Sequence, residues 1–429
     1  MTVKLSQFAQ GLRTETAFDV LAVAKALKAK GKDVVELQIG DSPFSTTRHA
    51  KQAGIEAIQN NQTHYCPSVG LPEFRAEIAL HLNGEYGLSL DAENVVVGHG
   101  AKLFEQFFCE AVLNPGDEVL VFSPQFPTYV PNIERRQGRV VFSALKQEDD
   151  FRPSLVDVEQ FVTQHDRARA IFLNSPHNPT GGVATEQDIH GIAEIIRGRP
   201  IALFSDEPYN HMVWRGEHHT PLAQPDFLDQ CVAAYTFSKS YSMSGWRLGY
   251  AVGGPRLIDA IGTMINTSLS CVPPMVQLAG LEALQKDSTE RDEMMSQFGK
   301  KVDLLTEALA RVDGVRVVPP GGTFYVFPNV AEICNRLGIT SHGLAMYLLE
   351  AADDEFGVAC LGGECFGEAG HGFLRFSCAE PDERLLQAVA FLSDASSRAD
   401  RVRRYLLEHA EYRRDTPYFI PAGSSTEKT

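Results

Sequence analysis

Short runs of apolar residues, many of them β-branched, recur along the chain and are separated by stretches with helical spacing. The clearest runs lie at 94–97, 119–122, 170–173, 201–204 and 232–236. Apolar runs of this length are typical of strands that are buried on both faces of a mainly parallel sheet. The helical stretches supply the crossovers that parallel strands require. We therefore expect an α/β fold whose large domain holds a mixed, mainly parallel sheet flanked by helices.

The pattern changes towards the C-terminal end of the chain. Strand-like segments there surround a Pro-Pro-Gly-Gly turn, at 315–318, 323–327 and 372–377. This arrangement predicts a smaller α+β domain to which both ends of the chain contribute. The expected division is a small domain of residues 1–45 and 311–395, a large domain of residues 46–310, and a charged C-terminal tail of residues 396–429.

Charge and composition exclude several kinds of partner. The 429 residues carry a formal net charge of −16, which argues against nucleic acid or an anionic membrane as a partner. No apolar run approaches the thickness of a bilayer, and the start of the chain lacks the apolar core of a signal peptide. The eight cysteines form no CxxC pair. We expect a cytoplasmic protein with no metal site and no disulfide framework.

Polar side chains follow several of the predicted strands. Asn174, Asp206, Ser238 and Lys239 each lie within three residues beyond the end of an apolar run. In sheets of this kind the ligand crevice lies beyond the carboxyl ends of the strands. These side chains therefore mark the expected binding site.

Lys239 is the strongest candidate for chemistry. It follows a buried strand, with hydroxyl side chains before it and Arg247 eight residues after it. An arginine and nearby hydroxyls suit a phosphate, because a guanidinium binds phosphate oxygens bidentately. Taken alone, such a lysine is more often a solvated surface residue, and such an arginine part of a surface ion pair.

Three further segments have both a structural and a functional interpretation. Asp206 after a buried strand suits a helix N-cap, or a buried cation such as a protonated pyridine nitrogen. Asn178 lies in a proline-containing loop, and its amide suits a ligand oxygen. The turn at 98–100 precedes a helix, whose N-terminal N–H groups bind phosphate. Each segment alone is a weak signal.

Together these motifs resemble the fold-type I pyridoxal-5′-phosphate (PLP) enzymes, and within them the aspartate aminotransferase-like enzymes of the class I and II aminotransferase family. The matching pieces occur in the family's order, at Tyr65, Gly70 and 74–75, 98–102, 174–181, 206–209, 238–250, 321–325 and 373–377. Ordered motifs in one chain are far more specific than any one of them. The resemblance covers roughly residues 15–395.

The resemblance implies roles for individual residues. Lys239 would hold PLP as a Schiff base, and Asp206 would pair with the pyridine nitrogen. Asn178 and Tyr209 would hold the phenolic oxygen, and Phe126 would stack on the ring. The residues expected around the phosphate are Gly100, Ala101, Lys102, Thr236, Ser238 and Arg247, with Tyr65 contributed by the neighbouring subunit.

The resemblance also implies the reaction. It predicts an aminotransferase of amino-acid metabolism that transfers the α-amino group of an amino acid to a 2-oxo acid by a ping-pong mechanism through Lys239. Arg375 would bind the substrate carboxylate, helped by the Gly40 backbone and Asn178. Asp19 falls near the position where aspartate-type members place a threonine, so its carboxylate would repel a dicarboxylic substrate. The shared site predicts a homodimer.

Two alternatives stay open at the level of sequence. The same fold supports other PLP reactions, namely those of a carbon–sulfur β-lyase, a cyclopropane-forming synthase or an oxidase, and these enzymes share Lys239, Asp206 and Arg375. A non-catalytic, cofactor-binding regulator is the second alternative. The complete set of site residues argues against it.

Overall fold

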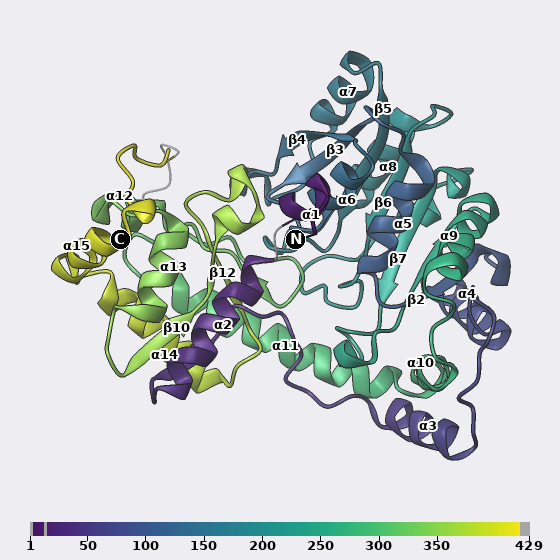
Figure 1. Cartoon of the computed structure of the whole chain (residues 1–429), viewed down its shortest axis with the longest axis horizontal. Coiled ribbons are helices and arrows are strands. Elements are labelled where there is room, and N and C mark those ends of the chain that lie inside the picture. Colours follow the sequence, from purple (N-terminus) through teal and green to yellow (C-terminus); the bar gives the residue numbers. More distant parts are fainter. Residues whose placement is uncertain (1–2, 13–14, 421–429) are drawn as a thin grey trace. The chain divides into compact units, whose positions relative to one another are not determined.

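The computed structural model of the chain describes residues 3–12 and 15–420 and divides into two compact units (Figure 1). Within the described residues, the first unit comprises 3–12, 40–300 and 320–324, and the second comprises 15–39, 301–319 and 325–420. Residues 3–12, 40–45 and 320–324, expected in the smaller domain, thus belong to the first unit, and residues 301–310, expected in the large domain, belong to the second. In the first unit the ring of Phe8 lies 5.2 Å from the guanidinium of Arg135.

A seven-stranded sheet forms the centre of the first unit. Its strands are β2 (Val95–Gly98), β3 (Glu118–Ser123), β4 (Arg139–Ala144), β5 (Ala168–Asn174), β6 (Ala202–Asp206), β7 (Cys231–Thr236) and β8 (Gly249–Gly253). The strand order is β2-β8-β7-β6-β5-β3-β4. Only β8 runs antiparallel to its neighbours. The expected mixed, mainly parallel sheet is therefore confirmed.

Helices cover both faces of this sheet. The helices that lie wholly in the first unit are α1 (Gln7–Gly11), α3 (Arg48–Gln59), α4 (Pro72–Tyr86), α5 (Lys102–Val112), α6 (Tyr129–Arg135), α7 (Leu155–Gln164), α8 (Glu186–Ile196), α9 (Pro255–Ser268) and α10 (Pro274–Lys286). Helix α5 packs against α6 and α9, and α7 packs against α8. The connections through α5 and α6 run across the sheet in one direction, and those through α7 and α8 run in the other. Because parallel crossovers are right-handed, the two pairs of helices lie on opposite faces.

Aromatic rings make up much of the core beneath α5 and α6. The ring of Phe108 on α5 lies 5.6 Å from Phe172 and 5.1 Å from Phe204. Tyr129, the first residue of α6, lies 5.1 Å from the same Phe172 ring. Each fully buried aromatic side chain of this kind contributes roughly 1.5–3 kcal/mol of burial free energy. The core thus holds α6, and Tyr129 with it, against strand β5.

Strand register places the predicted site residues side by side. Asn174, the last residue of β5, pairs directly with Asp206, the last residue of β6. Asp206 in turn pairs with Ala234 of β7, two residues before Thr236 ends that strand. Parallel strands end at the same edge of a sheet, so the side chains that follow them converge there.

The second unit contains two small sheets. Its strands are β1 (Asp33–Glu36), β9 (Tyr325–Val326), β10 (Phe356–Ala359), β11 (Leu361–Gly362) and β12 (Leu374–Ser377). Strands β1 and β10 pair in parallel, and β11-β12-β9 form an antiparallel sheet. The helices are α2 (Thr16–Ala29), α12 (Ala331–Leu337), α13 (Ser341–Glu350), α14 (Asp382–Ala395) and α15 (Ala399–Glu408), and α11 (Ser288–Leu309) begins in the first unit and ends in the second.

The region predicted as a charged tail includes α15 and a segment that reaches Tyr418. Val402 and Tyr405 of α15 are buried. The backbone of Tyr418 exchanges two hydrogen bonds with the side chain of Asn335, and its hydroxyl donates to Glu364. Much of this region is therefore packed against the second unit.

The prediction of a strand at 315–318 is wrong. Only Arg316 pairs there, in an isolated bridge with Asn329. Pro319 and Pro320 follow directly, and proline lacks the N–H that a strand ladder needs. As for membrane spans, no helix within the described ranges is both long enough and apolar enough to cross a bilayer.

Candidate active site

Asn174 organises the loop that follows β5. Its side-chain amide donates to the backbone carbonyl of Asp206 over 2.8 Å. Its side-chain oxygen accepts from the backbone N–H of Asn178 over 2.8 Å. One buried amide thus ties the end of β6 to the loop that carries Asn178, and fixes where the Asn178 side chain begins.

Asp206 is buried with only one of its two carboxylate oxygens hydrogen-bonded. The hydroxyl of Tyr129 donates to Asp206 Oδ2 over 2.6 Å. Asp206 Oδ1 is buried and has no hydrogen-bond partner among the described residues. Burial raises the pKa of Asp206 to about 6, although the bond from Tyr129 and the charges of Lys102 and Lys239 oppose the rise. A buried carboxylate oxygen without a donor is costly, so this atom is suited to a cationic or N–H group of a ligand.

The helix N-cap interpretation of Asp206 does not hold. The residues after β6 form turns, and the next helical segment begins only at Pro221. Tyr209 lies in the first of these turns, and its hydroxyl accepts from Asn178 Nδ2 at 3.4 Å. The predicted pair of Asn178 and Tyr209 is therefore brought together, with both side chains buried.

Lys239 lies among polar and aromatic groups of the first unit. Its ammonium donates to the carbonyl of Gly40 over 2.6 Å. The same nitrogen lies 5.9 Å from the centre of the Tyr209 ring and 5.7 Å from that of Phe324. Both distances are within the range of cation–π attraction. Lys239 is thus held beside Tyr209, as a residue that acts on a shared ligand would be.

An anion-binding corner forms where β2 meets α5. Gly100 adopts a φ of +85°, and a Cβ there would lie 2.6 Å from the Arg247 guanidinium. Arg247 donates to the carbonyls of His99 and Ser244. Ala101 is the N-cap of α5, which begins at Lys102. Glycine, guanidinium and helix N-terminus together suit a phosphate group.

The hydroxyls expected beside this corner also contact each other. Thr236 Oγ1 lies 2.9 Å from Ser238 Oγ and accepts from the Ser238 backbone N–H over 3.1 Å. The Lys102 ammonium lies 5.3 Å from the centre of the Phe126 ring. Phe126 makes an edge contact with Tyr129 at 5.8 Å, so this ring belongs to the neighbourhood of Asp206.

Three of the predicted residues lie outside this cluster of contacts. Tyr65 precedes α4 and is 90% exposed. In the second unit, Arg375 is buried, and its guanidinium lies 4.3 Å from the Tyr325 ring and donates to the carbonyl of Gln38. Asp19 is exposed on α2, also in the second unit. The roles proposed for these three stay predictions.

Sequence reasoning missed Tyr129. The nearest signal was its position three residues after Phe126, whose ring it contacts at 5.8 Å where α6 begins. The contact itself joins α6 to the end of β6, and residues 77 apart in sequence give no local sign of meeting.

Comparison with known proteins identifies the family to which this chain belongs. The profile of the family described as aminotransferase class I and II matches residues 32–392. The chain therefore belongs to the class I and II aminotransferases. It is an enzyme that transfers amino groups, and the fold-type I architecture expected from the sequence is confirmed.

Individual relatives are similar over nearly the whole chain. The probable aspartate/prephenate aminotransferase of Aquifex aeolicus is 36% identical over 388 residues, which are 90% of this chain and 96% of that protein. The asparagine–oxo-acid transaminase of Streptococcus mutans is 33% identical over 85% of this chain and 92% of its own. The aspartate aminotransferase of Thermus thermophilus, solved with maleate, has a TM-score of 0.84 and 31% identity over 92% of this chain and 100% of its own.

Proposed function

We propose that this aminotransferase uses PLP, bound in the first unit, to transfer the α-amino group of an amino acid to a 2-oxo acid in two half-reactions. The observation that carries the proposal is the buried Oδ1 of Asp206, which has no hydrogen-bond partner among the described residues. A protonated pyridine nitrogen supplies the donor that this oxygen needs. The other cofactor-binding groups lie in the same unit: a lysine, a phenol and an anion-binding corner.

Different site residues hold different groups of the proposed cofactor. PLP supplies an aldehyde that bonds amines and a ring that withdraws electrons when it is bound. The Asp206 carboxylate keeps the ring nitrogen protonated. Asn178 and Tyr209 hold the phenolic oxygen, and the corner formed by Gly100, Ala101, Lys102, Thr236, Ser238 and Arg247 holds the phosphate.

Lys239 is the proposed proton carrier. Its amine would hold the cofactor through the aldehyde that PLP supplies. As a positioned general base, the same amine would take the proton from the substrate Cα and later give it back. The contact with the Gly40 carbonyl keeps the amine near the reacting atoms.

We further propose a cytoplasmic homodimer. Tyr65 is 90% exposed, so its ring is accessible to complete the site of a second copy. The test is the oligomeric state by sedimentation, together with Tyr65→Phe. The variant should weaken PLP binding and leave the dimer intact.

For the amino donor we propose aspartate. The support is that the relatives from Aquifex and Thermus are named for aspartate. Asp19 would oppose the second carboxylate of aspartate. Asp19→Thr should therefore raise kcat/KM for aspartate about fivefold and leave that for alanine unchanged, because one like charge about 4 Å away costs about 1 kcal/mol in water.

The experiment that tests the reaction is a spectrum of the purified protein. The wild type with added PLP should show the visible absorption of the bound cofactor, and Lys239→Ala should lack the band. Lys286→Ala, an exposed lysine paired with Glu282, is the control and should keep it. Amino acid without a 2-oxo acid should release one equivalent of 2-oxo acid per site and then stop.

Other outcomes would select among the alternatives. Ammonia released with continuous turnover indicates a lyase, and oxygen consumption indicates an oxidase. Binding without turnover indicates a regulator. A wild-type protein that shows no absorption change with PLP would overturn the cofactor assignment.

A further inference from the structure

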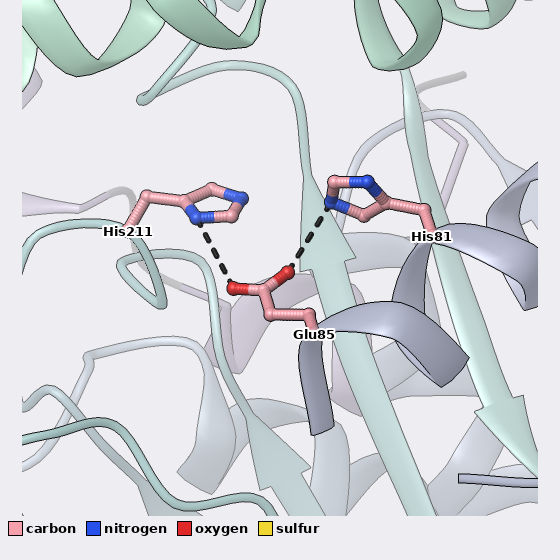
Figure 2. Close-up of side chains that lie close together, drawn as sticks. All are labelled: His81, Glu85 and His211. Carbon is pink, nitrogen blue, oxygen red and sulfur yellow. Dashed lines mark ion pairs between the residues drawn. The ribbon is translucent and has the colours of Figure 1, made fainter. Parts of the chain in front are cut away.

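Two histidines and a glutamate meet in the first unit, away from the residues assigned to the cofactor. His81 and Glu85 lie one turn apart near the end of α4, and His211 lies in the turns after β6. Figure 2 shows the Glu85 carboxylate between the two rings, with one oxygen towards each. Glu85 Oε2 lies 3.2 Å from His81 Nε2, and Oε1 lies 3.4 Å from His211 Nδ1. The ligand atoms of the three residues all lie within 4.8 Å of one another.

These distances suit a small divalent cation. Zinc binds imidazole nitrogen and carboxylate oxygen at about 2.0–2.2 Å in tetrahedral geometry, which separates ligand atoms by about 3.3 Å. The two contacts of Glu85 with the rings, at 3.2 and 3.4 Å, are close to this separation but use different oxygens, Oε2 and Oε1. One ligand atom from each residue lies within 4.8 Å of the other two, so the three must draw together to share one ion.

One ligand atom is left without a hydrogen-bond partner among the described residues. His81 Nε2 is buried and makes no hydrogen bond there, although Glu85 Oε2 is close enough for one. The angle at this contact is therefore wrong for a hydrogen bond. A buried ring nitrogen in this position costs free energy unless another group binds it. A cation placed between the rings and the carboxylate satisfies it.

The surroundings supply a second layer around His211. Its other nitrogen, Nε2, lies 3.3 Å from the Asn210 amide and 3.4 Å from Arg291 Nη1. Zinc at Nδ1 requires the proton on Nε2, so the Asn210 amide must turn its oxygen to this nitrogen while Arg291 Nη1 donates to the Tyr241 hydroxyl over 3.1 Å. The Arg291 charge is paired with Asp292 at 2.8 Å. Glu85 therefore leaves the cluster with a net negative charge, which favours a cation.

We propose that His81, Glu85 and His211 form a binding site for one zinc ion per chain. The ion joins α4 to the turns after β6, two residues beyond Tyr209, and so stiffens the segment that carries Tyr209. The site is structural, because within the described part of the chain no hydrogen bond or ion pair joins its residues to Lys239 or Asp206. It is independent of the proposed reaction and departs from the expectation, based on the cysteines, that the chain has no metal site.

The experiment is zinc binding to the tag-free holoenzyme after chelator treatment, followed by gel filtration and metal analysis. The wild type should retain one zinc per chain. His81→Gln and His211→Gln should each raise the dissociation constant for zinc at least about 100-fold, since each removes a ligand. His165→Gln is the matched control, because His165 lies 3.3 Å from Glu118 without a third ligand among the described residues, and it should bind like the wild type.

Two results would contradict the proposed zinc site. One is a wild type that retains no zinc, and the other is zinc retained equally by both histidine variants. Should a variant fail to fold, as judged by circular dichroism, X-ray absorption at the zinc edge of the wild type decides. A shell of nitrogen and oxygen with two imidazoles supports the site, and a shell with sulfur or without imidazole contradicts it.

Discussion

The hydroxyl of Tyr129 donates a hydrogen bond of 2.6 Å to Oδ2 of Asp206 in the interior of the first unit. Burial raises the pKa of Tyr129 well above its usual value, so the phenol keeps its proton and always acts as the donor. The bond favours the ionised carboxylate against the effect of burial, which raises the pKa of Asp206 to about 6. Tyr129 is thus a positioning residue for Asp206, the group that we propose to face the cofactor nitrogen.

Tyr129→Phe should raise the pKa of Asp206 further. At neutral pH less of the carboxylate is then ionised, so kcat/KM should fall and should recover as the pH rises. Hydrogen bonds to charged groups contribute about 1.5–3 kcal/mol, so PLP affinity should fall by about 10- to 100-fold. The measurements are the pH profile of kcat/KM and a PLP titration. Tyr347→Phe, which removes a buried hydroxyl with no hydrogen-bond partner among the described residues, is the control and should change neither.

Gly100→Ala should disturb the anion-binding corner. Gly100 has a φ of +85°, and the added methyl group would lie 2.6 Å from Arg247 Nη2. Gly198→Ala is a matched control, because Gly198 has a φ of +71° but no atom lies within 4 Å of the position that its Cβ would take. Both variants should lose about 1 kcal/mol of stability from the backbone conformation. Only Gly100→Ala should also weaken PLP binding, measured by titration, and equal PLP affinity in the two variants would contradict the assignment.

Glu207 should make stability depend on pH. Burial raises its pKa from 4.5 to about 8, so the folded chain holds a proton that the unfolded chain releases. The bound proton adds to the free energy of unfolding. This added free energy is fully present below pH 4.5 and is lost as the pH rises to about 8. Between these values the wild type should lose up to about 1.4 kcal/mol per pH unit relative to Glu207→Gln, which has no proton to lose.

The measurement for Glu207 is Tm against pH for both proteins. The two curves should separate steadily above pH 4.5 and run parallel above pH 8. Glu159→Gln, at an exposed position on α7, is the control and should follow the wild type. Curves for wild type and Glu207→Gln that stay parallel throughout would show that Glu207 is ionised in the folded chain.

The variant Arg375→Lys tests whether Arg375 binds the substrate carboxylate. The guanidinium is held between the rings of Tyr325 and Phe366, at 4.3 and 4.9 Å. Lysine keeps the charge but not the planar fork that binds a carboxylate bidentately. KM for the amino acid and for the 2-oxo acid should both rise about 10- to 100-fold. PLP affinity should not change, and a loss of PLP affinity would place Arg375 at the cofactor instead. Arg384→Lys, at a surface ion pair with Asp33, is the control.

Local patterns in the sequence were enough for most strands of the central sheet and for the residues at their ends. Strands buried on both faces read as continuous apolar runs, and Asn174 and Asp206 lie just beyond such runs. β4 was not predicted, because it is an edge strand whose residues are largely half-buried or exposed. The strand at 315–318 was predicted wrongly, because its apolar residues were read without the two prolines that follow.

By itself, the sequence determined the fold class, the family and the set of residues that can hold a cofactor, because each of these depends on local patterns and on short motifs in a fixed order. Only the tertiary structure decided which groups meet. The bond from Tyr129 to Asp206 and the approach of His211 to His81 and Glu85 join segments 77 and more than a hundred residues apart. Such contacts depend on how helices and loops pack onto the sheet, and packing is a property of the whole chain that no local pattern records.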